Sequence, residues 1–464
     1  MSLVGPAERL ASLWTVSYSP LRAFWLLRGV YLLLSADLWF EMIEHGGRYG
    51  LGDFNVAHFA WLDLVLPLPT PALYVGLLIA AGTISLWLGL GAAPRWLRLT
   101  LAAAYTLGWL LSVHDSYQHH YLLSWLLCWC AAVPDLTARR ALSDEPVQGW
   151  GLPMTCLTCA IVYFFTGISK SEPDWRRGAA LRSITHSMPP GSAHPGKFDG
   201  ARDLLLGLGL DDSSVWQLFA LSTIALQWTV SAGYLASTSR DAHASRLRIV
   251  LCSLGLVAAL SFHALAELFH VFEIGLFSFY MMFIACLLLA PAKLWKMPTR
   301  GLAWLSDRLS DGVGQAVVSA SESAQRPSGA DLARPLLSVA LLLAIGFAIP
   351  LPGSVWATSV AALLVLVCTV ATMRQAEGAR VALDALALKT TFSAFVLWLS
   401  LTQSRVPFDY YRRTAGELYR MGQLEQALSL YKLAQRYAPS DQSRVGRIRE
   451  LENELNQGSA KRRF

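Results

Sequence analysis

Residues Trp150–Trp175 read WGLPMTCLTCAIVYFFTGISKSEPDW. No charged side chain interrupts residues 150–168, and a run of this length can cross the hydrocarbon core of a bilayer as a helix. Inside lipid only helices and closed barrels satisfy the backbone hydrogen bonds, so the stretch predicts a membrane helix. Lys170 follows its last bulky side chains. That position is compatible with an anchor that reaches the lipid headgroups, or with an amine whose surroundings tune it as a base.

The composition of the whole chain agrees with a membrane location. Of the 464 residues, 54% are hydrophobic and 15% are charged, whereas soluble proteins carry roughly 25% charged residues. The net charge of +6 comes from short, scattered basic clusters, which are typical of loops on the cytoplasmic side of membrane proteins. We therefore expect the lipid bilayer as a partner, and no nucleic acid.

Apolar stretches recur along the chain and predict an all-α, polytopic membrane helix bundle. The core would contain about eight spans, and about three more would follow. The stretches lie at residues 21–40, 72–92, 97–114, 119–134, 150–168, 215–237, 247–272, 275–291, 335–351, 354–373 and 387–402.

Loop charge predicts the orientation of these spans. Basic loops such as Pro94–Arg98, Thr137–Arg140 and Ala292–Arg300 follow alternate spans, which places them on one face, by rule the cytoplasmic one. We therefore expect a cytoplasmic N-terminus. Lys170 and several histidines then fall near the opposite, outer face, although they belong to different helices.

Five regions follow from this pattern: an N-terminal cytoplasmic segment (1–20), a transmembrane core (21–296), a polar linker (297–334), additional transmembrane helices (335–402) and a helical tail (403–464). The core includes an outer segment after Lys170 that predicts two short interfacial helices. The tail resembles one tetratricopeptide-like helical hairpin, with Gly422 at its turn and Tyr431 on its apolar face. One such hairpin cannot bury its apolar face alone, so it must dock on the rest of the chain or on a partner.

Histidines at the predicted helix ends are further candidates for chemistry. His119 and His120 begin a span, and His263, Glu267 and His270 share one face of a predicted helix. Such side chains either transfer protons or bind a ligand, or they meet headgroups and hold helices together. No HxxxH pair occurs, so we expect no metal.

Several of these stretches resemble one known family. They are RGVYLLLSAD, FAWLDLVLPLPTPALY, SYQHHYLLSWLL, YFFTGISKSEPDWRRGAAL and FHALAELFHVFEIGLFSF. Together they resemble the HTTM (horizontally transferred transmembrane) domain family, the bacterial relatives of vitamin K-dependent γ-carboxylase. The resemblance covers about residues 20–292 and implies an integral, multi-pass protein of a bacterial inner membrane.

The resemblance also implies a chemistry. In this family a base deprotonates a reduced quinone, which reacts with dioxygen to an epoxide, and full carboxylases add carbon dioxide to a peptidyl glutamate. The essential lysine corresponds to Lys170, and the family's histidines correspond to His119, with His120 adjacent, and to His263. The spacing after His263 departs from the pattern, which makes His270 the alternative. We also assign Tyr163, Trp175, Glu267 and His270 to substrate binding.

Two functions from different classes stay open. The first is a membrane enzyme that oxygenates a lipid-soluble, vitamin K-like hydroquinone and needs no metal. Carboxylation of glutamate is unproven and carbon dioxide stays open as a further cofactor, because no counterpart of the large substrate-docking portion of the full carboxylases is recognisable in the sequence. The alternative is a non-catalytic scaffold or lipid-binding protein whose tail recruits a protein partner.

Overall fold

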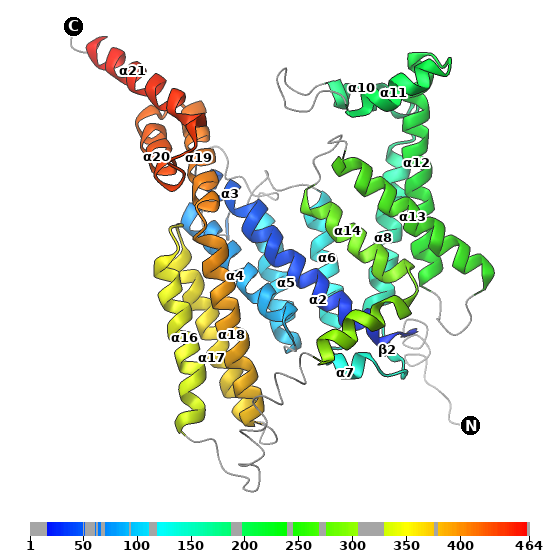
Figure 1. Ribbon diagram of the computed structural model, residues 1–464, viewed down its shortest axis with the longest axis horizontal. Coiled ribbons are helices and arrows are strands. Elements are labelled where there is room, and N and C mark those ends of the chain that lie inside the picture. Colours follow the sequence, from blue (N-terminus) through cyan, green and yellow to red (C-terminus); the bar gives the residue numbers. More distant parts are fainter. Residues whose placement is uncertain are drawn as a thin grey trace. The chain divides into compact units, whose positions relative to one another are not determined.

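A computed structural model describes most of the chain between residues 16 and 461 (Figure 1). The described residues are 16–49, 51, 61, 64–65, 70–91, 94–110, 118–186, 197–238, 245–268, 275–304, 329–374 and 379–461. The chain divides into two compact units. Unit 1 comprises Met1–Val30, Ala92–Leu99 and Leu122–Gln315, and unit 2 comprises Tyr31–Gly91, Thr100–Tyr121 and Ala316–Phe464.

The described residues are almost entirely helical, as the sequence predicts. Three helices begin in one unit and end in the other: α2 (Pro20–Asp37), α5 (Arg95–Leu110) and α6 (Gln118–Ala132). The other elements of unit 1 are β1 (Val16–Tyr18), α7 (Ala138–Ala141), β2 (Val147–Gly149), α8 (Gly151–Ser169), α9 (Pro173–Arg176), α10 (Ala179–His186), α11 (Lys197–Gly207), α12 (Asp212–Ser237), α13 (Arg246–Leu268), α14 (Leu276–Leu289) and η7 (Ala292–Trp295). The helices α10 and α11 are the two short helices predicted for the outer segment.

Each of the predicted apolar stretches lies on a helix in the described residues. Within the described ranges, five helices are long and apolar enough to cross a membrane. They are Pro20–Arg48, Pro71–Gly89, Gly151–Ser169, Asp212–Ser237 and Arg246–Glu267. A sixth candidate is the pair Leu276–Leu289 and Ala292–Trp304, which is bent by 115° where Pro291 interrupts the helical hydrogen bonds. The chain is therefore a multi-pass membrane protein, and the count of about eleven spans stays a prediction.

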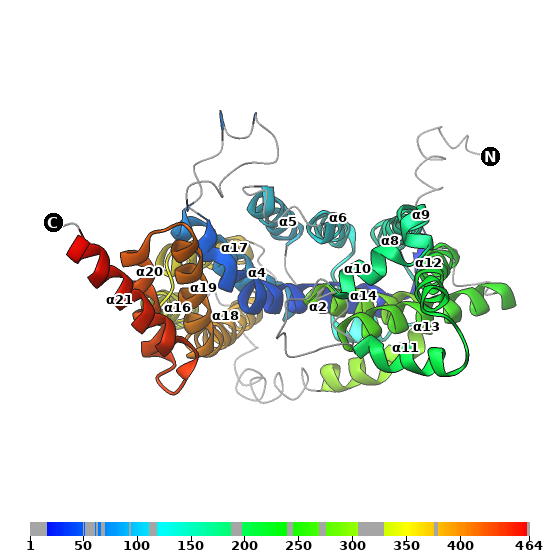
Figure 2. The ribbon, with the colours of Figure 1, turned by 90° about the horizontal axis from the view of Figure 1, so that it is seen from above.

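The helices α8, α12 and α13 pack side by side in unit 1 (Figures 1 and 2). Gly233 and Gly255 bring α12 and α13 into contact, since a Cβ atom on either glycine would lie within 3.0 Å of the other's Cα. The hydroxyl of Ser231 on α12 donates to the carbonyl of Ala160 on α8, at 2.8 Å.

The direction of these helices follows from their neighbours. Trp175 and Leu181, which follow α8, pack against Trp216 at the start of α12, so α8 and α12 are antiparallel. The helix α13 comes next in sequence and packs back along α12. Consequently α8 and α13 run in the same direction.

One small sheet departs from the predicted all-α fold. β1 pairs with β2 in antiparallel orientation, with Ser17 opposite Gln148. Each strand has only three residues, which is too short for the alternating pattern by which strands are recognised in a sequence.

Unit 2 contains α4 (Pro71–Gly89) and a bundle of three further apolar helices, coloured yellow to orange in Figure 1. These are α16 (Gly329–Ala348), α17 (Ser354–Arg374) and α18 (Ala379–Leu401). The indole of Trp356 on α17 donates to the carbonyl of Ala72 on α4, at 3.0 Å. Before α4, the first span continues through a π-helix, η1 (Leu38–Met42), into α3 (Ile43–His45) and η2 (Gly46–Arg48).

The tail forms three helices and a short turn: α19 (Arg405–Arg420), α20 (Leu424–Tyr437), η8 (Gln442–Arg444) and α21 (Val445–Lys461). Gly422 makes the turn between α19 and α20 with φ +75°, a conformation that favours glycine. Ala427 and Tyr431 of α20 are buried together with Leu451 of α21. The hairpin therefore buries its apolar face against a third helix of the same chain. Its likeness to a tetratricopeptide repeat stays a prediction.

The tail also docks on the end of the first span, through α19. A Cβ atom on Gly47 would overlap the Thr414 side chain, which shows how closely the two backbones approach. The Arg413 guanidinium lies 2.9 Å from the Glu44 carboxylate. The helix α19 therefore packs on the last turns of the first span.

Candidate functional site

His263 is held at both of its ring nitrogens. Its side chain is 2% exposed, its Nε2 lies 2.5 Å from the Tyr163 hydroxyl, and its Nδ1 lies 3.3 Å from the Ser278 hydroxyl. A hydroxyl can donate or accept, so these partners suit either neutral tautomer of the imidazole. The contacts connect α13 to α8 and to α14, and they fix the orientation of the ring.

Tyr163 is one of the residues that the sequence assigns to substrate binding. Here its hydroxyl contacts His263, and its ring stacks on Tyr234 of α12, with centroids 6.0 Å apart. Tyr163 is thus a positioning residue for His263. The sequence analysis does not predict Ser278 as a partner of His263. A hydroxyl in the otherwise apolar helix LFSFYMMFIACLLL is nevertheless a feature that could have identified it.

Lys170 is the C-cap residue of α8 and the first residue beyond the candidate span. The preceding turn is closed by Ser171, whose hydroxyl donates to the carbonyl of Gly167 at 2.8 Å. The chain then turns into α9, where Pro173 occupies the first helical position and needs no hydrogen-bond acceptor. This turn brings the Trp175 ring against the lysine, with Nζ 5.4 Å from the ring centroid.

Burial lowers the pKa of Lys170 well below its ordinary range, to about 8. The nearby carboxylates of Glu172 and Asp174 are exposed, and neither pairs with the amine in the described part of the chain. The sequence left open whether these carboxylates would raise the basicity of the amine. In the structure, burial is the effect that acts on it.

Lys170 and Glu267 lie beyond the Tyr163–His263 contact, on the two helices that the contact joins. Lys170 follows Tyr163 by seven residues and Glu267 follows His263 by four, so each shares a helix face with the residue it follows. The Oε1 atom of Glu267 is buried and has no hydrogen-bond partner among the described residues. His270, the alternative to His263, lies outside the described residues.

His119 and His120 lie in unit 2, at the start of α6, and both are half-buried. The Nδ1 atom of His120 lies 2.8 Å from the Tyr105 hydroxyl of α5. Tyr105 is buried, and the sequence reasoning did not identify it. Whether these histidines share a site with Lys170 stays a prediction, since Lys170 and His263 belong to unit 1.

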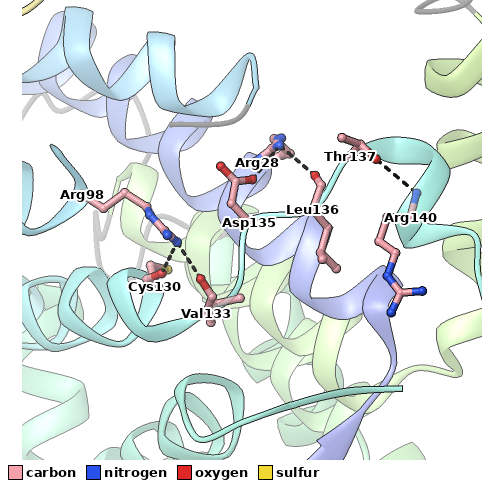
Figure 3. Close-up of polar contacts among 8 residues, drawn as sticks. All are labelled: Arg28, Arg98, Cys130, Val133, Asp135, Leu136, Thr137 and Arg140. Atoms are coloured by element: carbon pink, nitrogen blue, oxygen red, sulfur yellow. Dashed lines mark hydrogen bonds and ion pairs between the residues drawn. The ribbon is translucent and has the colours of Figure 1, made fainter. Parts of the chain in front are cut away.

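Two buried arginines hold the other end of α6 in unit 1 (Figure 3). Arg98 donates to the carbonyls of Cys130 and Val133, at 3.0 and 2.6 Å. These are among the carbonyls that a helix leaves without intrahelical partners at its C-terminus. The sequence counts Arg98 among the positive charges of a cytoplasmic loop, but Arg98 lies in α5, and its buried side chain caps the end of α6.

Arg28 completes this arrangement from α2 (Figure 3). Its guanidinium donates to the Asp135 carboxylate at 3.0 Å and to the carbonyl of Leu136 at 3.1 Å. Both partners lie in the segment between α6 and α7. The charge of Arg28 is thereby neutralised and fixed in place.

A large part of the chain matches one known protein family. Residues 16–293, more than half of the chain, match the HTTM domain. The chain belongs to the HTTM family. No curated protein and no solved structure gives a significant match.

The HTTM match begins at β1 and ends in η7. It contains every residue that the sequence assigns to a site, and the helices α16 to α21 follow it. Among the described residues of the HTTM chain, no group of three or more His, Cys, Asp or Glu side chains could hold a metal ion.

Proposed function

We propose that this HTTM protein is a membrane enzyme in which Lys170 takes a proton from a lipid-soluble hydroquinone, so that the hydroquinone reacts with dioxygen. One hydroquinone and one dioxygen would give one quinone epoxide and one water. The observation that carries the proposal is the half-buried amine of Lys170 at the end of α8, with a pKa near 8.

Two effects shift the pKa of this amine in opposite directions, and the larger effect decides how much of the amine is neutral. The Trp175 ring favours the ammonium form by about 0.5–1 kcal/mol at a partly exposed site. That amounts to less than one pKa unit, since one unit corresponds to about 1.36 kcal/mol. Burial lowers the pKa by more than this, and with a pKa of about 8 roughly one amine in ten is neutral at pH 7. A general base that acts near neutral pH needs such a fraction of neutral amine.

The contacts of His263 support a positioning role for it. Tyr163 lies on the same helix as Lys170, and its bond to His263 holds α8 against α13. The Ser278 hydroxyl holds the same ring from α14. In this proposal His263 fixes the height and rotation of the helix that carries the base.

The location of the proposed site follows from orientation. Lys170 and Glu267 both lie at the C-terminal ends of their helices, and loop charge predicts that these ends face the outer side of the membrane. The resemblance implies that this is a bacterial inner membrane. A hydrophobic substrate would enter sideways from the bilayer. The proposal covers oxygenation alone, because Lys170 as a base accounts for that step and no described residue is assigned a role in carboxylation.

The test is the formation of quinone epoxide by purified protein in lipid nanodiscs, with reduced vitamin K and oxygen. We expect epoxide from the wild type and at least a hundredfold less from Lys170→Ala, as for the loss of a general base. Lys296→Ala is the matched control, because Lys296 pairs with Asp144 on an exposed surface. Equal turnover by wild type and Lys170→Ala would remove the lysine from the mechanism.

A second function, a scaffold that recruits a protein partner, is favoured by one observation. The tail has its own buried cluster around Tyr431 and Leu451 and is attached to the first span by ion pairs, as an independent module would be. Deletion of residues 403–464 separates the two functions. A scaffold loses its activity in the cell on this deletion while any quinone turnover persists, and an enzyme without a recruiting role keeps both.

A further inference from the structure

Glu267 has a hydrogen-bonding capacity that the described part of the chain leaves unused. Its Oε1 atom is buried without a partner, one helical turn after His263. Burying a carboxylate oxygen without a donor is unfavourable, and nearly all buried polar atoms in proteins have a partner. An ionisable side chain in a membrane helix marks a candidate functional site.

The position of Glu267 relative to Lys170 follows from the Tyr163–His263 contact. At 1.5 Å per residue, Lys170 lies about 10 Å beyond Tyr163 and Glu267 lies about 6 Å beyond His263 along their axes. The two helices run in the same direction, so both side chains lie beyond the contact toward the same end. Their heights differ by about 4–5 Å, roughly one helical turn.

Lys170 and Glu267 do not bind each other in the part of the chain that the structure describes. No ion pair joins them among the described residues, and the lysine Nζ lies over the Trp175 ring instead. Buried charges are normally paired, because an unpaired buried charge is costly. A proton acceptor and a carboxylate, kept apart on facing helices, suit a ligand with a polar group at each end.

We propose that Glu267 accepts a hydrogen bond from the second hydroxyl of an aromatic diol whose first hydroxyl meets the Lys170 amine. This inference rests on the proposed function and adds a selectivity to it. The oxidised quinone has carbonyl oxygens in place of both hydroxyls and offers Glu267 no donor. Glu267 thereby distinguishes the reduced ligand from the oxidised one, because a carboxylate facing a carbonyl oxygen is left unpaired and repelled.

Binding without turnover tests this selectivity. The full-length protein in nanodiscs is titrated without oxygen with three probes: 2-methyl-1,4-dihydroxynaphthalene, its 4-methyl ether, and the corresponding quinone. The wild type should bind the diol about tenfold or more tightly than the ether or the quinone, the value of one hydrogen bond to a charged group. Equal affinities for the three probes, or no binding of the diol, would overturn the assignment.

Variants then identify the residue responsible. In Glu267→Gln the preference for the diol should fall below about threefold, and Glu267→Asp should keep part of it. Glu172→Gln is the matched control, an exposed carboxylate near Lys170 that should leave the preference unchanged. An unchanged preference in Glu267→Gln would contradict the inference even if the protein forms epoxide. Conversely, a Glu267-dependent preference without epoxide formation would contradict the proposed function alone.

Discussion

The Tyr163 hydroxyl lies 2.5 Å from Nε2 of His263, and this contact joins two helices across 100 positions of sequence. It is buried on α8 and α13, where no water replaces a lost partner. The same two helices carry Lys170 and Glu267. The contact between Tyr163 and His263 therefore sets the spacing between Lys170 and Glu267, the residues to which we assign chemistry.

Removing this hydroxyl should destabilise the protein. In Tyr163→Phe the His263 Nε2 loses its partner inside the bundle, at a cost of about 1–3 kcal/mol. The measurement is the thermal unfolding of detergent-solubilised protein. Tyr121→Phe is the control, because the Tyr121 side chain is 42% exposed. Equal unfolding temperatures for the two variants would show that the contact contributes nothing to stability.

Epoxide formation should increase with pH. Lys170 acts only when its amine is neutral, and burial places its pKa at about 8. The rate therefore rises between pH 7 and pH 9 and levels off above. Stability should also rise above pH 8, because the unfolded chain, with its ordinary lysine pKa, then binds more protons than the folded one. A rate that does not change from pH 7 to pH 9 would contradict this role.

Substitution of Trp175 should shift the same pH profile. Without the ring, Trp175→Leu loses the stabilisation of the ammonium, so the pKa of Lys170 falls by less than one unit. The midpoint of the pH–rate profile moves to lower pH by that amount. A shift to higher pH would show that the ring serves mainly to bury the amine.

Gly422 should tolerate no other residue without a loss of tail stability. Its φ of +75° costs an alanine about 1–2 kcal/mol, although no atom within 4 Å would clash with a new Cβ. Limited proteolysis of the full-length protein measures the opening of the tail. Gly446→Ala is the matched control: it also has open space, it lies in α21, and alanine there favours the helix. We expect faster cleavage for Gly422→Ala only.

The ion pairs between the tail and the first span should respond to charge reversal. Glu44 and Arg413 are 2.9 Å apart, and Arg48 lies 3.0 Å from Glu417, whose side chain is 8% exposed. Arg413→Glu should release the tail and increase its cleavage by protease. The double variant Glu44→Arg with Arg413→Glu restores the opposite charges and should restore protection. If the double variant is cleaved as fast as the single one, the pair does not hold the tail.

The sequence predicts the elements of this chain better than their contacts. Apolar runs identify membrane helices because lipid leaves the backbone no alternative, and Gly422 marks a turn because of its backbone freedom. The partners of His263, namely Tyr163 and Ser278, lie on two other helices, and only packing brings their hydroxyls to its ring.

The contacts of Arg98 and Tyr105 could not be predicted from the sequence for the same reason. Arg98 lies in a basic stretch that is typical of a cytoplasmic loop. Its side chain nevertheless points inward and donates to two backbone carbonyls at the C-terminal end of α6. Tyr105 is one aromatic residue among many in apolar stretches until α5 and α6 pack and place it against His120. Local sequence describes neither of these contacts, because each joins residues that only the tertiary fold makes neighbours.

The docking of α19 on α3 and η2 has a consequence for biosynthesis. Glu44 and Arg48 leave the ribosome before Arg413 and Glu417, because each precedes its partner by 369 residues in the chain. Glu44 and Arg48 therefore lack these partners until every intervening helix has been made and inserted. Attachment of α19 to the first span can therefore occur only after every helix between them has been made, so protection of the tail from protease reports a late step in the folding of this chain.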